Sequence, residues 1–191
     1  GLFKKVVIAD SLSMHVNMIF KDYTAYNGGV LFLGLIYFSF QIYCDFSGYS
    51  DIAIGTAKLL GLELMSNFKS PYFAKSLPEF WKRWHISLST WFRDYLYIPL
   101  GGSKKGKIIT IKNLFIVFVI SGMWHGASWT FLIWGLVHVI FYIPHIIRPS
   151  KYFYENDLNN RKSFLKFLRR IFQVGTTYFF TTLSWVFFRS E

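Results

Sequence analysis

The chain has 191 residues, of which 53% are apolar and 21% aromatic, and its 21 lysines and arginines against 10 acids give a net charge of +11. The aromatic content excludes a disordered chain, and the single cysteine, Cys44, excludes a disulfide-stapled fold. Only 16% of the residues are charged, against roughly 25% in an ordinary soluble domain. Three long windows contain no charge at all, and this distribution predicts a membrane protein.

The first uncharged window, Tyr23 to Cys44, has 22 residues and predicts one membrane-spanning helix. It ends in an acidic motif, Asp45 to Asp51 (DFSGYSD). A carboxylate inside a membrane usually faces a bundle interior or a cavity, whereas a carboxylate at the membrane interface can belong to a structural charge network. The sequence is compatible with both interpretations of these two aspartates.

The next organised stretch, Ser76 to Gly102, predicts one amphipathic helix lying along the membrane surface. Ser76 and Glu79 have the spacing of a capping box at its start, and Pro99 followed by glycines ends it. Its charged residues lie opposite an apolar face. That face consists of Leu77, Phe80, Trp81, Trp84, Leu88, Trp91, Phe92 and Tyr95.

The middle window, Asn113 to Ile147, has 35 residues and is too long for one crossing. It lies between two basic loops, Lys58 to Lys112 and Arg148 to Arg170, which together hold 17 of the 21 lysines and arginines. Such an excess marks the cytoplasmic side of a membrane, and it explains the basic charge without nucleic acid. The window must therefore enter the membrane and return, as a re-entrant segment that turns at Ser121 to Ser128. This turn would place His125 inside the membrane, where irregular backbone must be buried or line a cavity.

The last window, Ile171 to Phe188, has 18 residues and predicts one more spanning helix near the lower limit of length. The chain begins with Gly1 rather than methionine and stops directly after this apolar run. We therefore expect an excerpt of a longer, multi-pass, all-α membrane protein, with residues 1–191 forming part of one membrane domain.

His125 is the strongest candidate for chemistry among the five histidines. It lies between Gly122 and Gly126 at the expected turn, and these glycines would let another chain or a ligand approach. Burial disfavours the charged form of an imidazole. A buried His125 would therefore stay neutral and accept a proton from a hydroxyl group as a general base. The alternative is a packed core histidine.

The other histidines give weaker signals. His85 lies at the edge of the apolar face of the predicted interfacial helix, either as an interface anchor or as a group at the entrance of a cavity. His15, His138 and His145 are predicted to be structural, because no further ligands are spaced for a metal site. The sequence also lacks a glycine-rich phosphate loop and the signatures of zinc proteases and serine hydrolases.

Two longer motifs resemble a known family. They are Trp81 to Gly102 (WKRWHISLSTWFRDYLYIPLGG) and Gly122 to Trp129 (GMWHGASW). In this order and spacing they resemble the membrane-bound O-acyltransferase family, most closely its bacterial alginate O-acetyltransferase branch, as does the segment from Asp45 to Asp51. The resemblance implies a ring of transmembrane helices around a central channel, with re-entrant and interfacial helices, in the inner membrane of a bacterium.

The same resemblance implies an enzyme that moves an acyl group, expected to be acetyl, to hydroxyls of an exported polysaccharide or of a carrier of it. We expect the donor to be a cytoplasmic thioester such as acetyl-CoA. The family's essential histidine corresponds to His125, and a second recurrent histidine corresponds to His85. No metal and no tightly bound cofactor are implied. The expected partners are membrane lipids, the acyl donor, and the exported polymer or an exported acetyltransferase. The residues expected to bind substrate are Trp124, Asp45, Lys82 and Arg83.

Two other functions are compatible with these features. One is D-alanyl transfer to teichoic acid, in which the donor is a thioester on a small acidic carrier protein. The other is a non-catalytic transporter or channel subunit for the polymer, in which His125 only lines a pore. Within the enzyme class, a covalent acyl-enzyme on Ser121, Ser128 or Cys44 is disfavoured, because such a nucleophile needs an adjacent base.

Overall fold

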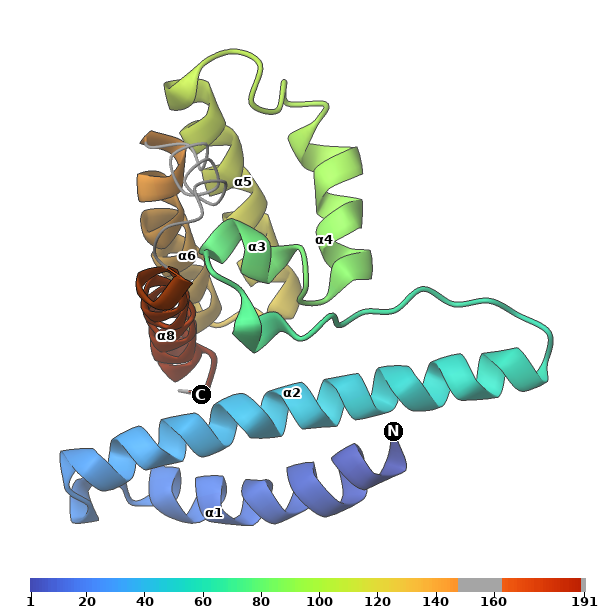
Figure 1. Ribbon diagram of the computed structural model, residues 1–191, viewed down its shortest axis with the longest axis vertical. Helices are drawn as coiled ribbons and strands as arrows, with labels where there is room; N and C mark the ends of the chain where they lie inside the picture. Colours follow the sequence, from blue (N-terminus) through green and yellow to red (C-terminus); the bar gives the residue numbers. More distant parts are fainter. Residues whose placement is uncertain (148–162, 190–191) are drawn as a thin grey trace. The chain divides into compact units, whose positions relative to one another are not determined.

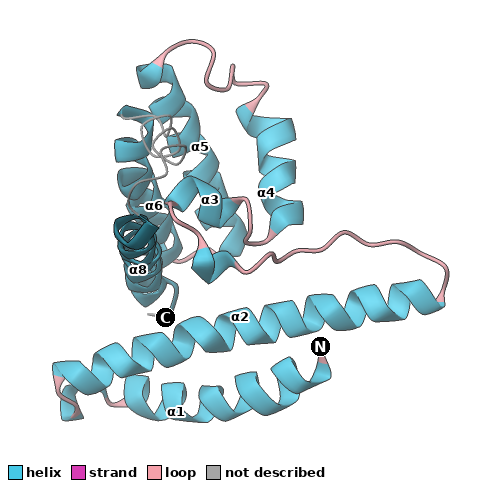
Figure 2. Cartoon of the chain, in the orientation of Figure 1, coloured by secondary structure: helices cyan, strands magenta, loops and turns pink. Residues whose placement is uncertain are grey.

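A computed structural model describes residues 1–147 and 163–189, and every regular element in these ranges is a helix (Figure 1). Figure 2 shows the same chain coloured by secondary structure, with helices joined by loops. The expected all-α class is therefore confirmed for the described residues. The chain divides into two compact units, Gly1–Lys69 and Ser70–Glu191. The ring of helices around a channel stays a prediction, as does the assignment of the whole chain to one membrane domain.

The first unit is a pair of antiparallel helical segments. A π-helical segment, η1 (Phe3–Ala9), continues directly into α1 (Asp10–Lys21). After a short 3-10 turn, η2 (Tyr23–Ala25), the long helix α2 (Gly28–Leu59) returns alongside both of them (Figure 1). The expected helix of the first uncharged window is therefore present as α2.

Helix α2 is longer than the window that predicted it. Its 32 residues make a helix of about 48 Å, and it runs on through the acidic motif. The helix continues through the two carboxylates, and each accepts a hydrogen bond from a lysine of the N-terminal segment. Lys4 Nζ donates to Asp51 at 2.8 Å, and Lys5 Nζ donates to Asp45. These ion pairs support the structural interpretation of the two aspartates.

The second unit begins with a short 3-10 turn, η3 (Pro71–Phe73). Three short helical segments then follow where the sequence predicted one long amphipathic helix from Ser76 to Gly102. They are α3 (Leu77–Trp81), α4 (Ile86–Phe92) and the π-helical η4 (Arg93–Tyr97). The predicted start is confirmed, since the Ser76 side chain accepts a hydrogen bond from a backbone N–H in the first turn of α3. The prediction of one continuous helix to residue 102 is wrong.

The long helix breaks at His85, whose backbone is left-handed with φ 44° and ψ 57°. The residues that follow are rich in serine and threonine, which compete with helical hydrogen bonding. The Ser89 hydroxyl, for example, donates to the Trp84 carbonyl at 3.2 Å. The break also divides the predicted apolar face, because Trp84 is buried whereas Trp91 and Tyr95 are exposed.

The middle window forms a hairpin of α5 (Lys107–His125) and α6 (Trp129–Ile147), joined by residues 126–128. The turn lies where the sequence predicted it. Each helix has 19 residues and is about 28 Å long, so the hairpin has the length of two crossings rather than of one shallow loop. At its open end, Lys107 Nζ donates to the Ile147 carbonyl at 3.0 Å. The two ends next to the basic loops therefore lie together.

Gly135 allows α5 and α6 to pack closely. A Cβ atom at this position would lie less than 3.0 Å from the Phe118 carbonyl oxygen of α5. Small residues at helix crossings let two backbones approach, and such crossings are common in membrane proteins. The hairpin is therefore held by close backbone packing as well as by side chains.

Helix α8 (Ser163–Arg189) covers the third predicted window. Within the described ranges, three helices are long and apolar enough to cross a membrane, namely α2, α5 and α6. Helix α8 is not among them, because Gln173 and four threonines dilute its apolar stretch. Its crossing therefore stays a prediction. It begins inside the second predicted basic loop, of which residues 148–162 lie outside the described part of the chain.

Candidate active site

His125 is the last residue of α5, directly before the turn to α6. Its half-buried imidazole lies among four aromatic rings, with ring centres 5.0 Å away for Trp124, 5.1 Å for Phe188, 5.2 Å for Trp134 and 6.2 Å for Phe131. No described residue forms a hydrogen bond with its ring nitrogens. The ring is therefore held by packing, and its nitrogens are available to a ligand.

The two glycines beside His125 are explained by the packing of α6. A Cβ atom on Gly126 would collide with the Phe131 ring, and a Cβ atom on Gly122 would lie 2.5 Å from the Phe131 carbonyl oxygen. The segment that approaches these glycines is therefore α6 of the same chain. Because Phe131 also contacts the His125 ring, these glycines help to set the position of the imidazole.

His85 lies directly before the first residue of α4, at the break in the predicted interfacial helix. Its ring centre is 6.2 Å from that of Trp124, the residue that precedes His125. Burial lowers the pKa of His85 to about 4, so its imidazole is uncharged at neutral pH. The same indole thus contacts both histidines, and the fold brings together three of the residues that the sequence singled out.

Trp134 of α6 is a site residue that sequence reasoning missed. Its ring contacts His125 and also the ring of the buried His138, at 4.9 Å. Trp134 is 1% exposed, and no described atom accepts a hydrogen bond from its indole N–H. A buried donor without a partner is rare, so this N–H is a candidate for contact with a substrate oxygen. Trp124, by contrast, is 59% exposed and leaves the site open on its side.

His138 is a core residue, as predicted. It is fully buried, its Nε2 lies 3.0 Å from the Ser184 hydroxyl of α8, and its ring stacks on Phe118. In residues 1–147 and 163–189, no group of three or more histidines, cysteines or acids is placed to hold a metal ion.

The remaining predicted substrate-binding residues have different surroundings. Arg83 Nη2 donates to Glu79 Oε1 at 2.6 Å, an interaction that holds the side chain against α3. Asp45 belongs to the first unit, where it is paired with Lys5. Lys82 is exposed and lines a cavity of the second unit.

This cavity has a volume of about 740 Å³ and lies beside α5, with α4 and the end of α6 forming other walls. Lys82, Arg93 and Lys107 contribute its cationic groups, and most of the remaining lining is apolar. Lys107 and Ser121 both line it and are about 21 Å apart along α5. Ser121 lies one helical turn before His125. The cavity therefore reaches from the basic start of α5 to the neighbourhood of the candidate base.

Known proteins are similar to this chain in sequence over most of its length. Residues 5–185 match the membrane-bound O-acyltransferase (MBOAT) family. A "Probable alginate O-acetylase AlgI" of Pseudomonas syringae pv. tomato is 41% identical over 191 residues, which cover 100% of this chain and 34% of the relative. A "Peptidoglycan O-acetyltransferase" of Helicobacter pylori is 42% identical over 191 residues, with the same coverage of both chains. A "Teichoic acid D-alanyltransferase" of Bacillus subtilis is 36% identical over 110 residues, or 54% of this chain and 28% of the relative.

The chain therefore belongs to the membrane-bound O-acyltransferase family, as the motifs around His85 and His125 predicted. Within that family, two relatives that match the whole chain are named as O-acetylating proteins of two different glycans. The chain spans about a third of the length of these relatives.

Proposed function

We propose that the protein containing this chain is a membrane-embedded O-acyltransferase of the bacterial inner membrane. It transfers an acetyl group from a cytoplasmic thioester to hydroxyl groups of an exported polysaccharide. The observation that carries the proposal is the placement of His125 and His85 on either side of Trp124 in a chain of this family. The names of the relatives at 41% and 42% identity support acetyl as the group and a glycan as the acceptor.

His125 acts as the general base. Its imidazole accepts the proton of the acceptor hydroxyl while the hydroxyl oxygen attacks the thioester carbonyl carbon. The C–O bond forms, the C–S bond breaks, and the proton passes to the departing thiolate, which leaves an O-acetyl ester and a free thiol. A positioned base of this kind contributes about 10² to 10⁴ in rate.

The charge that develops on the carbonyl oxygen needs a hydrogen-bond donor. The Trp134 indole supports this assignment, because its N–H is buried without a described acceptor and its ring lies 5.2 Å from that of His125. A preorganised donor in a dry site stabilises such an oxyanion strongly. The neutral imidazole of His85 is a second donor and can position the thioester.

The cavity beside α5 supports a donor that arrives from the cytoplasmic side. Lys82 and Lys107 line it and belong to a stretch predicted to be cytoplasmic. The phosphates of acetyl-CoA would bind such cations. The uncharged arm that carries the acetyl group would follow the apolar wall toward Ser121.

Direct transfer is favoured over a covalent acyl-enzyme. The Ser128 hydroxyl lies 2.9 Å from the Thr130 hydroxyl rather than beside a base. Cys44 is buried in α2 of the first unit. Neither side chain has the adjacent base that a nucleophile requires.

A second candidate function is D-alanyl transfer, which is favoured by the Bacillus subtilis relative named a teichoic acid D-alanyltransferase. There the donor would be a thioester on a small acidic carrier protein. The cations Lys82 and Lys107 suit an acidic protein surface as well as the phosphates of coenzyme A.

The test uses purified full-length protein with acetyl-CoA and a glycan acceptor, and it measures free thiol and ester formation. We expect thiol release that depends on acceptor and falls by about 10² to 10⁴ in His125→Ala. His15→Ala, which replaces an exposed histidine of α1, is the matched control and leaves the rate unchanged. A near-normal rate in His125→Ala would contradict the assignment of the base. Turnover only with a carrier-bound D-alanyl thioester supports the second candidate, and no thiol release with either donor would contradict both candidates.

A further inference from the structure

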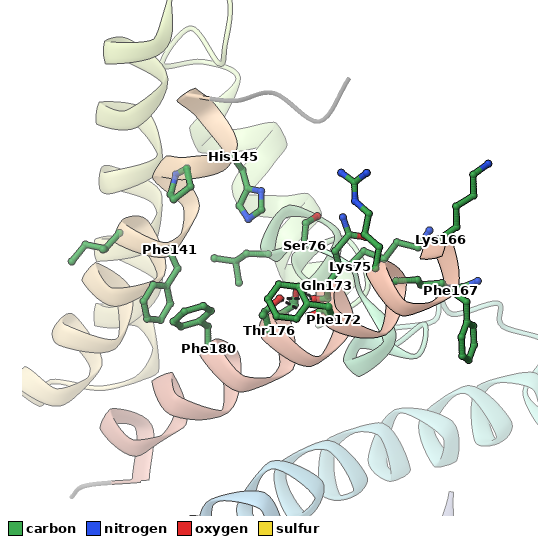
Figure 3. Close-up of a pocket in the computed structure, with 16 residues that line it drawn as sticks. Lys75, Ser76, Phe141, His145, Lys166, Phe167, Phe172, Gln173, Thr176 and Phe180 are labelled. Carbon is green, nitrogen blue, oxygen red and sulfur yellow. Dashed lines mark hydrogen bonds between the residues drawn. The ribbon is translucent and has the colours of Figure 1, made fainter. Parts of the chain in front are cut away.

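A second cavity of the Ser70–Glu191 unit, of about 840 Å³, lies between α6, α8 and the start of α3, and no proposed catalytic residue lines it (Figure 3). Figure 3 shows that it is wedge-shaped. Helices α6 and α8 meet at Phe141 and Phe180, whose ring centres are 4.7 Å apart, and diverge toward His145 and Lys166.

The described residues that line this wedge carry charge of one sign. Of the sixteen lining residues in the described part of the chain, four are lysine or arginine and none is aspartate or glutamate. Three of the four lie in the first eight residues of α8, and Figure 3 places one of them, Lys166, at the wide end of the wedge. Cations gathered in one cleft raise the local concentration of anions. The basic residues are Lys75, Lys166, Arg169 and Arg170.

The narrow end of the wedge, where Phe141 and Phe180 meet, is apolar. The hydroxyls of two lining threonines are used within α8, since Thr176 Oγ1 donates to the Phe172 carbonyl at 2.9 Å and Thr177 Oγ1 donates to the Gln173 carbonyl at 2.8 Å. They therefore require no hydrogen bond from a ligand. Along the whole wedge, from Phe167 beside Lys166 to the narrow end, the apolar lining residues are Leu77, Ile140, Phe141, Pro144, Phe167, Phe172 and Phe180.

The two ends are separated by a defined length. Arg170 precedes Phe180 by ten residues, which is about 15 Å along α8. A ligand that satisfies both ends needs an anionic head and an apolar body of about this length. Several of the apolar residues, such as Ile140 and Phe172, are exposed unless something covers them.

We propose that this wedge binds an anionic phospholipid, with the phosphate among Lys75, Lys166, Arg169 and Arg170 and an acyl chain along the wall toward Phe180. All four cations belong to the stretches predicted to be cytoplasmic, and basic pockets between membrane helices on that side bind acidic lipid headgroups. Coenzyme A offers similar phosphate chemistry, but its arm carries amide groups, whereas the threonine hydroxyls along this wall are already bonded within α8. The assignment does not depend on the proposed transfer reaction.

The bound lipid has a structural consequence. It fills the gap between α6 and α8. Helix α8 also carries Phe188, whose ring centre lies 5.1 Å from that of His125. Helix α8 is less apolar than the three helices of membrane-spanning composition, so packing against lipid on this face adds to its anchoring.

The test is native mass spectrometry of the detergent-purified full-length protein with phosphatidylglycerol or phosphatidylcholine of identical acyl chains. We expect selective retention of phosphatidylglycerol, and a loss of about thirtyfold in Lys75→Gln/Arg170→Gln, which removes two cations. The matched control, Lys21→Gln/Lys58→Gln, removes two exposed cations of the first unit and retains the lipid. A further variant, Gln173→Trp, keeps every cation but fills the wall, and it also loses the lipid.

Three results would overturn the proposal. The first is equal retention of phosphatidylglycerol by the wedge variants and the control variant. The second is equal retention of the two lipids by the unmodified protein. The third is displacement of phosphatidylglycerol by coenzyme A or by an acidic protein at comparable concentration, which would assign the cations to a soluble ligand. Because the readout is lipid mass, failure of the acetyl-transfer assay does not affect it.

Discussion

The backbone at His85 lets two roles of this residue be separated. Its φ of 44° lies in the left-handed region, which costs an L-residue roughly 1–2 kcal/mol and costs glycine almost nothing. His85→Gly and His85→Ala both remove the imidazole. Only the alanine variant keeps a Cβ atom, which is the source of the strain in the left-handed region. We expect the glycine variant to be the more stable of the two in thermal denaturation of the detergent-purified protein.

Acetyl transfer should respond differently, because the imidazole is absent from both variants. We expect both to lose activity to the same extent, as measured by thiol release from acetyl-CoA. Wild-type activity in His85→Gly would show that the residue serves only the turn between α3 and α4.

The proposed role of the Trp134 indole N–H, binding of the oxyanion, can be tested by a single substitution. Trp134→Phe keeps an aromatic ring against His125 and removes only the N–H that lacks a described acceptor. If that N–H binds the oxyanion, kcat falls by about 10² to 10³ while KM for acetyl-CoA changes little. A fall in thermal stability with unchanged kcat would instead identify a packing role. The Phe131→Leu variant, which alters another ring beside His125 without removing an N–H, is the control.

Single residues differed in how well the sequence predicted them. His85 and His125 were found because they lie in short motifs with unusual neighbours. Trp134 carries no such signal, since its role depends on which face of α6 packs against the end of α5. The pairing of Asp45 with Lys5 was equally hidden, because the two residues are 40 positions apart and meet only through the antiparallel packing of α2.

At the scale of elements, the α5–α6 hairpin depends on a close backbone crossing. Gly135→Ala would place a Cβ against the Phe118 carbonyl, and overpacking of this kind costs about 1–3 kcal/mol. Gly175→Ala is the matched control, because nothing lies within 4 Å of a Cβ at that position of α8. Removing a helix-interior glycine there adds up to about 1 kcal/mol. We expect opposite shifts in the denaturation temperature, and shifts of the same sign would contradict the crossing.

The helices also show where the pattern of apolar residues is sufficient to predict the structure. The uncharged windows predicted α2 and the hairpin, because a long apolar run has few alternatives to a helix. The stretch from residue 76 to residue 102 fits one helical face equally well, yet it breaks at His85. Trp84 is buried and Trp91 is exposed because of how the other helices pack against them. A helical wheel shows which residues share a face, but it does not show which of them other helices cover.

At the scale of the whole molecule, the proposed reaction requires reagents from two sides to reach His125, so the orientation of the hairpin is decisive. Its open end adjoins the basic stretches, and its closed end carries His125 about 28 Å away along α5. The excess of lysine and arginine predicts that the open end is cytoplasmic. The test uses full-length protein in which the native cysteines, including Cys44, have been replaced. Two single variants, Lys105→Cys and Ala127→Cys, then place one cysteine just outside each end of the hairpin. Each reports the side of the membrane on which its end lies.

We expect a membrane-impermeant maleimide to label Lys105→Cys in inside-out vesicles and to leave Ala127→Cys unlabelled from that side. Both positions are exposed in the structure, so a failure to label reflects the membrane rather than burial in this chain. Labelling of Ala127→Cys from the opposite side would place the turn at the outer surface, with His125 within reach of an exported polymer. Equal labelling of both positions from the cytoplasmic side would mean that the hairpin does not cross, and the acceptor would then have no route to the base.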